Sequence, residues 1–100
     1  MDQNEFSAEA LWLLPEENGN VQMGLTAAVK EQVGSLNQIE LLMKQHVQMG
    51  QAFLRLTGSL ATVEIEAPIS GRLITVNQAL VADPSRYQFD QDSDWLLIIN

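Results

Sequence analysis

Few residues of this chain are of a type that could carry out chemistry. It has one histidine, His46, and no cysteine. The missing cysteine excludes disulfides, thiol catalysis and thiolate metal sites, and one histidine excludes a multi-histidine metal site. Ser59 and Ser70 have no accompanying base and orienting group, so neither is expected to be a nucleophile. We therefore predict that the protein is not an enzyme.

Three alternating aspartates near the end of the chain suggest a cation site at first sight. Asp90, Asp92 and Asp94 imitate the first ligands of a calcium-binding loop. That loop needs glycine where Trp95 stands, and no suitable bidentate glutamate follows. We interpret the segment as a solvated acidic turn and predict no metal site.

Composition and charge limit the class of protein. The 100 residues include 13 Asp and Glu against 5 Lys and Arg, a formal charge of −8, and 46% are apolar. Such a surface repels phosphate backbones and anionic membranes, so neither nucleic acid nor a membrane is expected as a partner. The N-terminus does not resemble a signal peptide, and no stretch is apolar enough to span a bilayer. We expect a cytoplasmic protein with a disordered segment over residues 1–9 and a single domain over residues 10–100.

Alternating apolar and polar residues predict an all-β fold with one short helix. Asn18-Gly19 is a hairpin signal between strands at 10–14 and 21–25, because both residue types tolerate positive φ. Further strands are predicted over residues 36–43, 52–57, 61–66, 72–76 and 95–99, with a polar loop over residues 84–94.

The helix is expected over residues 26–33. Thr26 is predicted to be its N-cap by accepting a backbone N–H, and Gly34 its left-handed C-terminal cap. Val29 and Val33, four residues apart, form the predicted contact face with the sheet.

Side-chain size and alternation predict parts of the core. Trp12 and Trp95 are expected to be its large pieces. Strict alternation places Phe53, Arg55 and Thr57 together on one face of their strand.

Motifs in both halves of the chain carry a resemblance to a known family. They are Trp12, Asn18-Gly19, Gly24-Leu25-Thr26 and Val33-Gly34, then the block APISGRLITVNQAL over residues 67–80, followed by Pro84 and Trp95. Together they resemble the glycine cleavage system H protein, a lipoyl carrier. The resemblance implies a barrel-sandwich hybrid fold over residues 10–100. Within the block, Gly71 is expected to permit a turn that most residues cannot make, and Asn77 to tolerate left-handed geometry and to bond neighbouring backbone.

The resemblance also implies a carrier lysine at a hairpin tip, eight residues before Pro68, and Leu60 stands there. Lipoate is attached through an amide to a side-chain amine, which leucine lacks. Arginine could not substitute, because its guanidinium stays protonated and is a poor acyl acceptor. The two lysines of the chain, Lys30 and Lys44, lie far from this position in the sequence.

A second departure concerns the first strand. The family's strand reads His-Glu-Trp, and the resemblance implies that this glutamate helps to hold the loaded arm. Here Ala10 and Leu11 precede Trp12. The acid that follows the attachment position remains as Glu64.

We therefore predict a non-lipoylated H-protein-like domain without a cofactor, which acts as a protein-interaction or regulatory module. Its docking residues are expected to be Ser59, Leu60 and Glu64. The implied partners are glycine cleavage enzymes or lipoate-attaching enzymes. One alternative is a genuine lipoyl carrier that shuttles aminomethyl groups from an unusual attachment site. Another is an independent metal- or ligand-binding domain.

Overall fold

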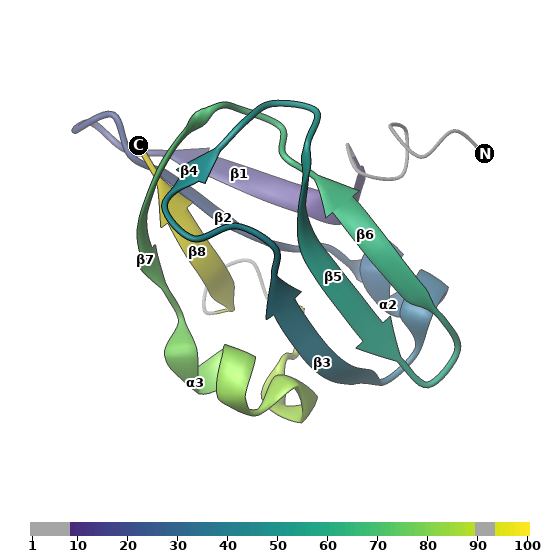
Figure 1. Ribbon diagram of the computed structural model, residues 1–100. Helices are drawn as coiled ribbons and strands as arrows, with labels where there is room; N and C mark the ends of the chain where they lie inside the picture. The colour runs from purple at the N-terminus through teal and green to yellow at the C-terminus, as the bar shows by residue number, and fades with distance from the viewer. Residues whose placement is uncertain (1–8, 90–93) are drawn as a thin grey trace.

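The computed structural model describes residues 9–89 and 94–100, whose strands form two antiparallel sheets (Figure 1). The five-stranded sheet has the order β1 (Leu11–Pro15), β2 (Val21–Leu25), β8 (Trp95–Ile99), β7 (Gly71–Val76) and β4 (His46–Val47). The three-stranded sheet has the order β3 (Leu36–Leu41), β5 (Ala52–Gly58) and β6 (Thr62–Glu66). The helical segments are α2 (Ala27–Val33), α3 (Gln78–Ala82) and the 3-10 helix η1 (Pro84–Arg86).

One apolar core joins the two sheets and α2. Its largest fully buried side chains include Met23, Leu97 and Ile99 from the first sheet, Phe53, Leu54, Leu56 and Ile65 from the second, and Val29 and Val33 from α2. Burial of these side chains supplies the main favourable free energy of folding. The all-β class and the contact face of the helix are confirmed. The two-residue β4, α3 and η1 are additional, and elements this short leave no periodic signal in a sequence.

Some predictions lie outside the described residues. They are the disorder expected over residues 1–8 and the positions of Asp90 and Asp92. Within the described ranges, no helix combines the length and apolar character needed to cross a membrane.

The β1–β2 hairpin is confirmed, but its turn is built differently from the prediction. Gly19 has φ of 90°, whereas Asn18 does not adopt positive φ. The Gly19 N–H donates to the Glu16 carbonyl at 3.1 Å, and the Asn20 N–H donates to Oδ1 of Asn18 at 3.0 Å. Asn18 therefore stabilises the turn through its side chain and not through left-handed backbone.

The predicted cap is confirmed at the C-terminal end of α2 but not at its N-terminal end. Gly34 is confirmed as the C-terminal cap residue, with φ of 78° and its N–H donating to the Lys30 carbonyl at 2.9 Å. Thr26 occupies the N-cap position, but its hydroxyl caps no helix N–H. It donates instead to the Glu9 carbonyl at 2.6 Å. The predicted capping bond is therefore wrong, because a backbone acceptor from the segment before β1 competes for the hydroxyl.

Strict alternation fails on β5. Phe53 and Leu54 are both buried, so Phe53 does not share a face with the half-buried Arg55 and Thr57. The register with β6 shifts between Ala52 and Leu54, which marks an irregularity of the β-bulge type. An extra residue at such a shift re-aims the side chains before it.

The two tryptophans also differ from the prediction. Trp95 is only half-buried. Trp12 is buried, but it is absent from the main apolar cluster to which its neighbour Leu11 belongs. Successive strand residues point to opposite faces, so Trp12 lies on the other face of the sheet from Leu11. There its indole ring covers Gly24, its partner on β2.

In the block over residues 67–80, Gly71 and Asn77 do not have the backbone geometry expected of them, although Asn77 does bond backbone as predicted. Gly71 is not at positive φ, and a Cβ at this position would approach Ile99 Cγ2 to 2.6 Å. Close strand approach, and not a special turn, therefore requires this glycine. Asn77 has φ of −76°, and its Nδ2 donates to the Trp95 carbonyl at 3.0 Å. It ties the end of β7 to the start of β8.

Packing of the Trp12 ring on Gly24 is testable by a double-mutant cycle. A methyl group at Gly24 would overlap the indole, so Gly24→Ala should lower the free energy of unfolding by about 1–3 kcal/mol. The same substitution in a Trp12→Leu background should cost clearly less, because the ring is gone. Urea denaturation followed by far-UV circular dichroism measures both costs. Equal costs in the two backgrounds would contradict this packing.

Candidate functional site

The tip of the β5–β6 hairpin is formed by Ser59, Leu60 and Ala61. The Gly58 N–H donates to the Ala61 carbonyl at 2.9 Å and closes the loop. The Leu60 side chain is 72% exposed, the largest exposed fraction among the big apolar residues that the structure describes as exposed. The β5–β6 turn lies at the lower right of Figure 1. The tip therefore presents one apolar side chain to solvent.

The backbone of this tip is bound to the end of α2. The Leu60 N–H donates to the Val33 carbonyl at 2.8 Å, and the Ser59 N–H donates to the Ser35 carbonyl at 2.9 Å. The Ser35 N–H in turn donates to Ser59 Oγ at 3.0 Å. We call these three hydrogen bonds the tip clamp. They fix the backbone under Leu60 although its side chain is exposed.

Glycine makes the close approach within the tip clamp sterically feasible. A Cβ at Gly58 would overlap the Val33 carbonyl, and one at Gly34 would overlap Ser59 Oγ. Gly34 also needs its positive φ of 78°. Both positions thus favour glycine for reasons that the separate local sequences do not reveal.

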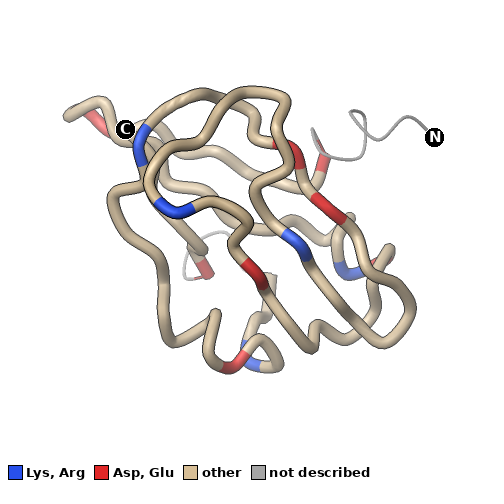
Figure 2. Tube along the Cα trace, in the orientation of Figure 1, with Lys and Arg blue, Asp and Glu red and all other residues tan. Residues whose placement is uncertain are grey.

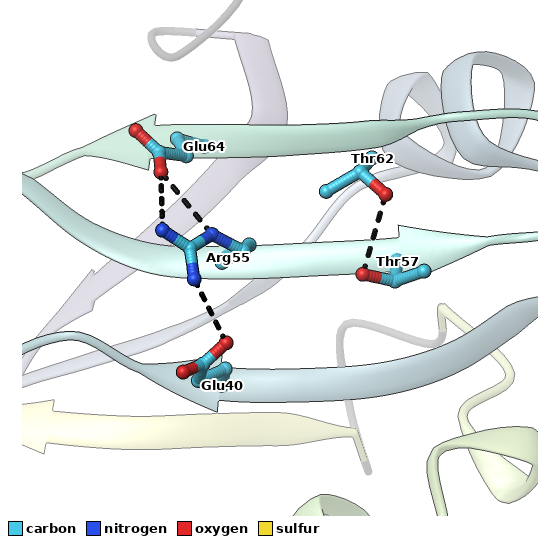
Figure 3. A network of polar contacts seen from close by, with 5 residues as sticks. All are labelled: Glu40, Arg55, Thr57, Thr62 and Glu64. Atoms are coloured by element: carbon cyan, nitrogen blue, oxygen red, sulfur yellow. Dashed lines mark hydrogen bonds and ion pairs between the residues drawn. The ribbon is translucent and has the colours of Figure 1, made fainter.

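Glu64 lies on the outer face of the three-stranded sheet in an ion-pair network (Figure 3). Arg55 on β5 donates to Glu64 Oε2 from Nη2 at 2.9 Å and from Nε at 3.2 Å. Its Nη1 donates to Glu40 Oε1 on β3 at 3.1 Å. Hydrogen bonding to Glu64, then to Glu40, raises the pKa of Arg55. Glu64 is thus held in one orientation, which sequence reasoning did not foresee.

The same face continues towards the tip with a pair of threonines. Thr62 Oγ1 donates to Thr57 Oγ1 at 3.4 Å across β5 and β6 (Figure 3). The three predicted docking residues therefore belong to one hairpin: Ser59 and Leu60 at its tip, Glu64 on its last strand. The structure brings them together on one element, and their docking role stays a prediction. Ser59 is engaged in the tip clamp, whereas Leu60 is the side chain that projects.

Neither lysine belongs to the tip. Lys30 lies on α2, and Lys44 lies in the connection between β3 and β4. Residues 59–61 carry a hydroxyl, an isobutyl and a methyl group, so none offers an amine.

Ser70 and Asp94, which were considered as a nucleophile and a metal ligand, each form a hydrogen bond within the fold. Ser70 Oγ accepts the Met49 N–H at 2.9 Å. Asp94 is buried, and its Oδ2 accepts the Gln88 N–H at 2.6 Å. In the part of the chain that the structure describes, no three His, Cys, Asp or Glu residues gather where they could hold a metal ion. His46 is exposed on β4 opposite Arg72.

Tyr87 is a buried polar residue that sequence reasoning missed. Its hydroxyl accepts the Leu25 N–H at 2.6 Å and donates to the Asp94 carbonyl at 2.5 Å. Its ring meets Phe89 edge to face at a centroid distance of 4.8 Å. Burial raises the pKa of the Tyr87 phenol well above its ordinary value of 10.0. The one aromatic residue with a polar end in the loop over residues 84–94 was the available signal.

The fold and this hairpin define the class of protein. Two packed antiparallel sheets with a projecting hairpin tip form a barrel-sandwich domain like that of a solved glycine cleavage system H protein. The model of the family "Glycine cleavage H-protein" matches residues 4–99. The chain therefore belongs to the glycine cleavage H-protein family, and both the resemblance and the barrel-sandwich fold are confirmed.

Individual relatives agree with this assignment. The chain is 35% identical to a glycine cleavage system H protein of Prochlorococcus marinus over 86 residues, which cover 84% of this chain and 67% of that protein. It is 25% identical to a glycine cleavage system H-like protein of Chlamydia pneumoniae, covering 94% and 84% of the two chains. The crystal structure of a glycine cleavage system H protein from Mycobacterium marinum superposes with a TM-score of 0.79 at 25% identity, covering 92% of this chain and 78% of that one.

Tyr87 gives a prediction for alkaline pH. Above pH 10 the unfolded chain loses the phenol proton while the native state keeps it, so stability should fall as pH rises beyond 10. Because this is the only tyrosine, phenolate absorbance near 295 nm reports it directly. In the native protein the titration should move well above pH 10, and urea should restore the ordinary value.

Tyr87→Phe is the matched variant. It should lose about 2–3 kcal/mol of stability at neutral pH, because two buried backbone groups lose their partner. The decline of stability above pH 10 should then become shallower. A native phenol that titrates at its ordinary pKa would contradict the buried position.

Proposed function

We propose that this protein is a non-lipoylated member of the H-protein family that works as a protein-interaction or regulatory module. The observation that carries the proposal is Leu60 at the hairpin tip where the family resemblance places the carrier lysine. On this view the chain is neither an enzyme nor a covalent carrier, and it needs no cofactor.

The chemistry of attachment supports this proposal. A lipoyl amide forms when an amine attacks an activated acyl group, and the isobutyl side chain of Leu60 has no such nucleophile. Ser59 at the same tip has a hydroxyl, but its oxygen accepts the Ser35 N–H in the tip clamp. A swinging arm has no anchor at this tip.

The tip is nevertheless suited to recognition. Leu60 projects from a backbone that the tip clamp already orders. The tip would therefore lose little conformational entropy when a partner binds it. Further along β6, the Glu64 carboxylate that Arg55 orders can add a polar contact at the rim. We therefore assign docking to Leu60 and Glu64 directly, and a positioning role to Ser59.

The partners we propose are the enzymes that normally meet H proteins, namely glycine cleavage or lipoate-attaching enzymes. A domain that occupies their docking site without an arm would compete with a loaded carrier. The formal charge of −8 would speed its encounter with a basic partner surface.

The second candidate is a genuine lipoyl carrier with an unusual attachment site. The names of the Prochlorococcus and Mycobacterium relatives favour it. Lys30 is the candidate amine. It lies three residues before Val33, whose carbonyl accepts the Leu60 N–H of the tip. Its position on α2 would require a ligase to recognise a helix in place of a hairpin.

Restoring an amine at the tip tests the proposal. Leu60→Lys should gain the mass of one lipoyl amide when incubated with a lipoate-attaching enzyme, lipoate and ATP. The wild type and Leu60→Arg should stay unmodified, because neither leucine nor a guanidinium is an acyl acceptor. Intact-mass spectrometry reads all three. Modification of the wild type would favour the second candidate. An unreactive Leu60→Lys variant would contradict the assignment of Leu60 to the position of the carrier lysine.

Docking is tested separately. Leu60→Asp should weaken binding to purified glycine cleavage or lipoate-attaching enzymes by roughly tenfold, as expected for a central apolar contact. Leu14→Asp is the matched control, because Leu14 is another exposed leucine, on β1. Biolayer interferometry gives the affinities. Absence of binding to every one of these enzymes, or equal loss in both variants, would rule out a Leu60 docking role.

A further inference from the structure

The Lys and Arg residues of this acidic chain lie on several different elements (Figure 2). Arg55 forms ion pairs with the carboxylates of Glu40 and Glu64. Arg72 on β7, His46 on β4 and Lys44 just before β4 lie around one edge of the five-stranded sheet. Within the described ranges, no ion pair involves these three side chains. We call this region the β4–β7 corner.

Backbone pairing holds the β4–β7 corner in place. His46 and Arg72 are direct cross-strand partners, so their side chains emerge on the same face. The Leu73 N–H donates to the Gln45 carbonyl at 2.8 Å. On its other side Arg72 exchanges two hydrogen bonds with Asn100, at 2.8 and 2.9 Å. The backbone that carries the Arg72 side chain is thus hydrogen-bonded on both sides.

A pocket of about 340 Å³ opens at this corner. Its lining residues are Gln45, His46, Arg72 and Leu73. Three of them bring hydrogen-bond donors, namely an amide, an imidazole N–H and a guanidinium fork, and none is a carboxylate. The fourth lining residue, Leu73, packs its side chain against the apolar core. The set repels cations and suits an anion with several oxygens.

We propose that the β4–β7 corner binds a small organic phosphate monoester. The planar guanidinium of Arg72 can donate two parallel hydrogen bonds to a phosphate, and Gln45 and His46 can each donate to a remaining oxygen. A carboxylate has two oxygens, which the Arg72 fork alone would satisfy. The pocket volume exceeds that of a bare phosphate and leaves room for an organic group beside it. This site is independent of the hairpin tip and of the proposed function.

Titration of the 15N-labelled protein with glycerol 3-phosphate tests the site. Amide shifts should saturate and be confined to residues near Gln45, His46, Arg72 and Leu73. Arg72→Gln should weaken the fitted affinity by at least about tenfold, since a charge-assisted bidentate contact is lost. Arg86→Gln is the matched control, because Arg86 is an exposed arginine on η1, outside this pocket. It should leave the affinity unchanged.

Further arms identify the anion. Inorganic phosphate should bind the same residues more weakly than glycerol 3-phosphate, and acetate more weakly still. Sodium chloride at matched ionic strength should give no saturable shift. Non-saturating shifts, equal affinity for acetate, or equal weakening by the two arginine variants would each overturn the proposal. Unchanged near-UV circular dichroism of Arg72→Gln would show that its fold is intact.

Discussion

The tip clamp is the constraint on which the proposed site depends. Val29 and Val33 bury one side of α2 in the core, and the carbonyl of Val33 then binds the Leu60 N–H. The position of the hairpin tip is thereby tied to the packing of the helix. Glycine at positions 34 and 58 allows the two backbones to approach this closely. An exposed side chain consequently sits on an ordered backbone, a combination that favours recognition because little freedom remains to be lost.

The other polar features are arranged around the same core. Tyr87 links the end of β2 to Asp94, just before β8, and so substitutes for backbone pairing where the sheet begins. Arg55 joins all three strands of the smaller sheet through Glu40 and Glu64. Arg72, His46 and Lys44, for which the described ranges show no ion pair, lie together at the β4–β7 corner. A chain of net charge −8 therefore has surfaces of different character on different elements, and these can serve different ligands.

Membership of the H-protein family fixes the scaffold, whereas the side chain at the tip decides what that scaffold can carry. The motif over residues 67–80 includes β7 and directly follows the β5–β6 hairpin, whose tip over residues 59–61 carries no amine. Fold and chemistry are thus separable here, because strand pairing depends on backbone geometry and a lipoyl amide depends on one nucleophile.

The sequence by itself determined the strand periodicity, the β1–β2 hairpin, the contact face of α2 and the nature of residue 60. These features depend on local patterning or on a single side chain, and both can be read directly from the sequence. Only the tertiary structure decided the tip clamp, the Arg55 network, the buried Tyr87 and the true roles of Thr26, Gly71 and Asn77. Each of these arises between separate segments of the chain, where competing hydrogen-bond partners and close backbone approach override local preference. The register shift at Phe53 and the placing of Trp12 outside the main cluster have the same origin, since they follow from how strands meet across the two sheets.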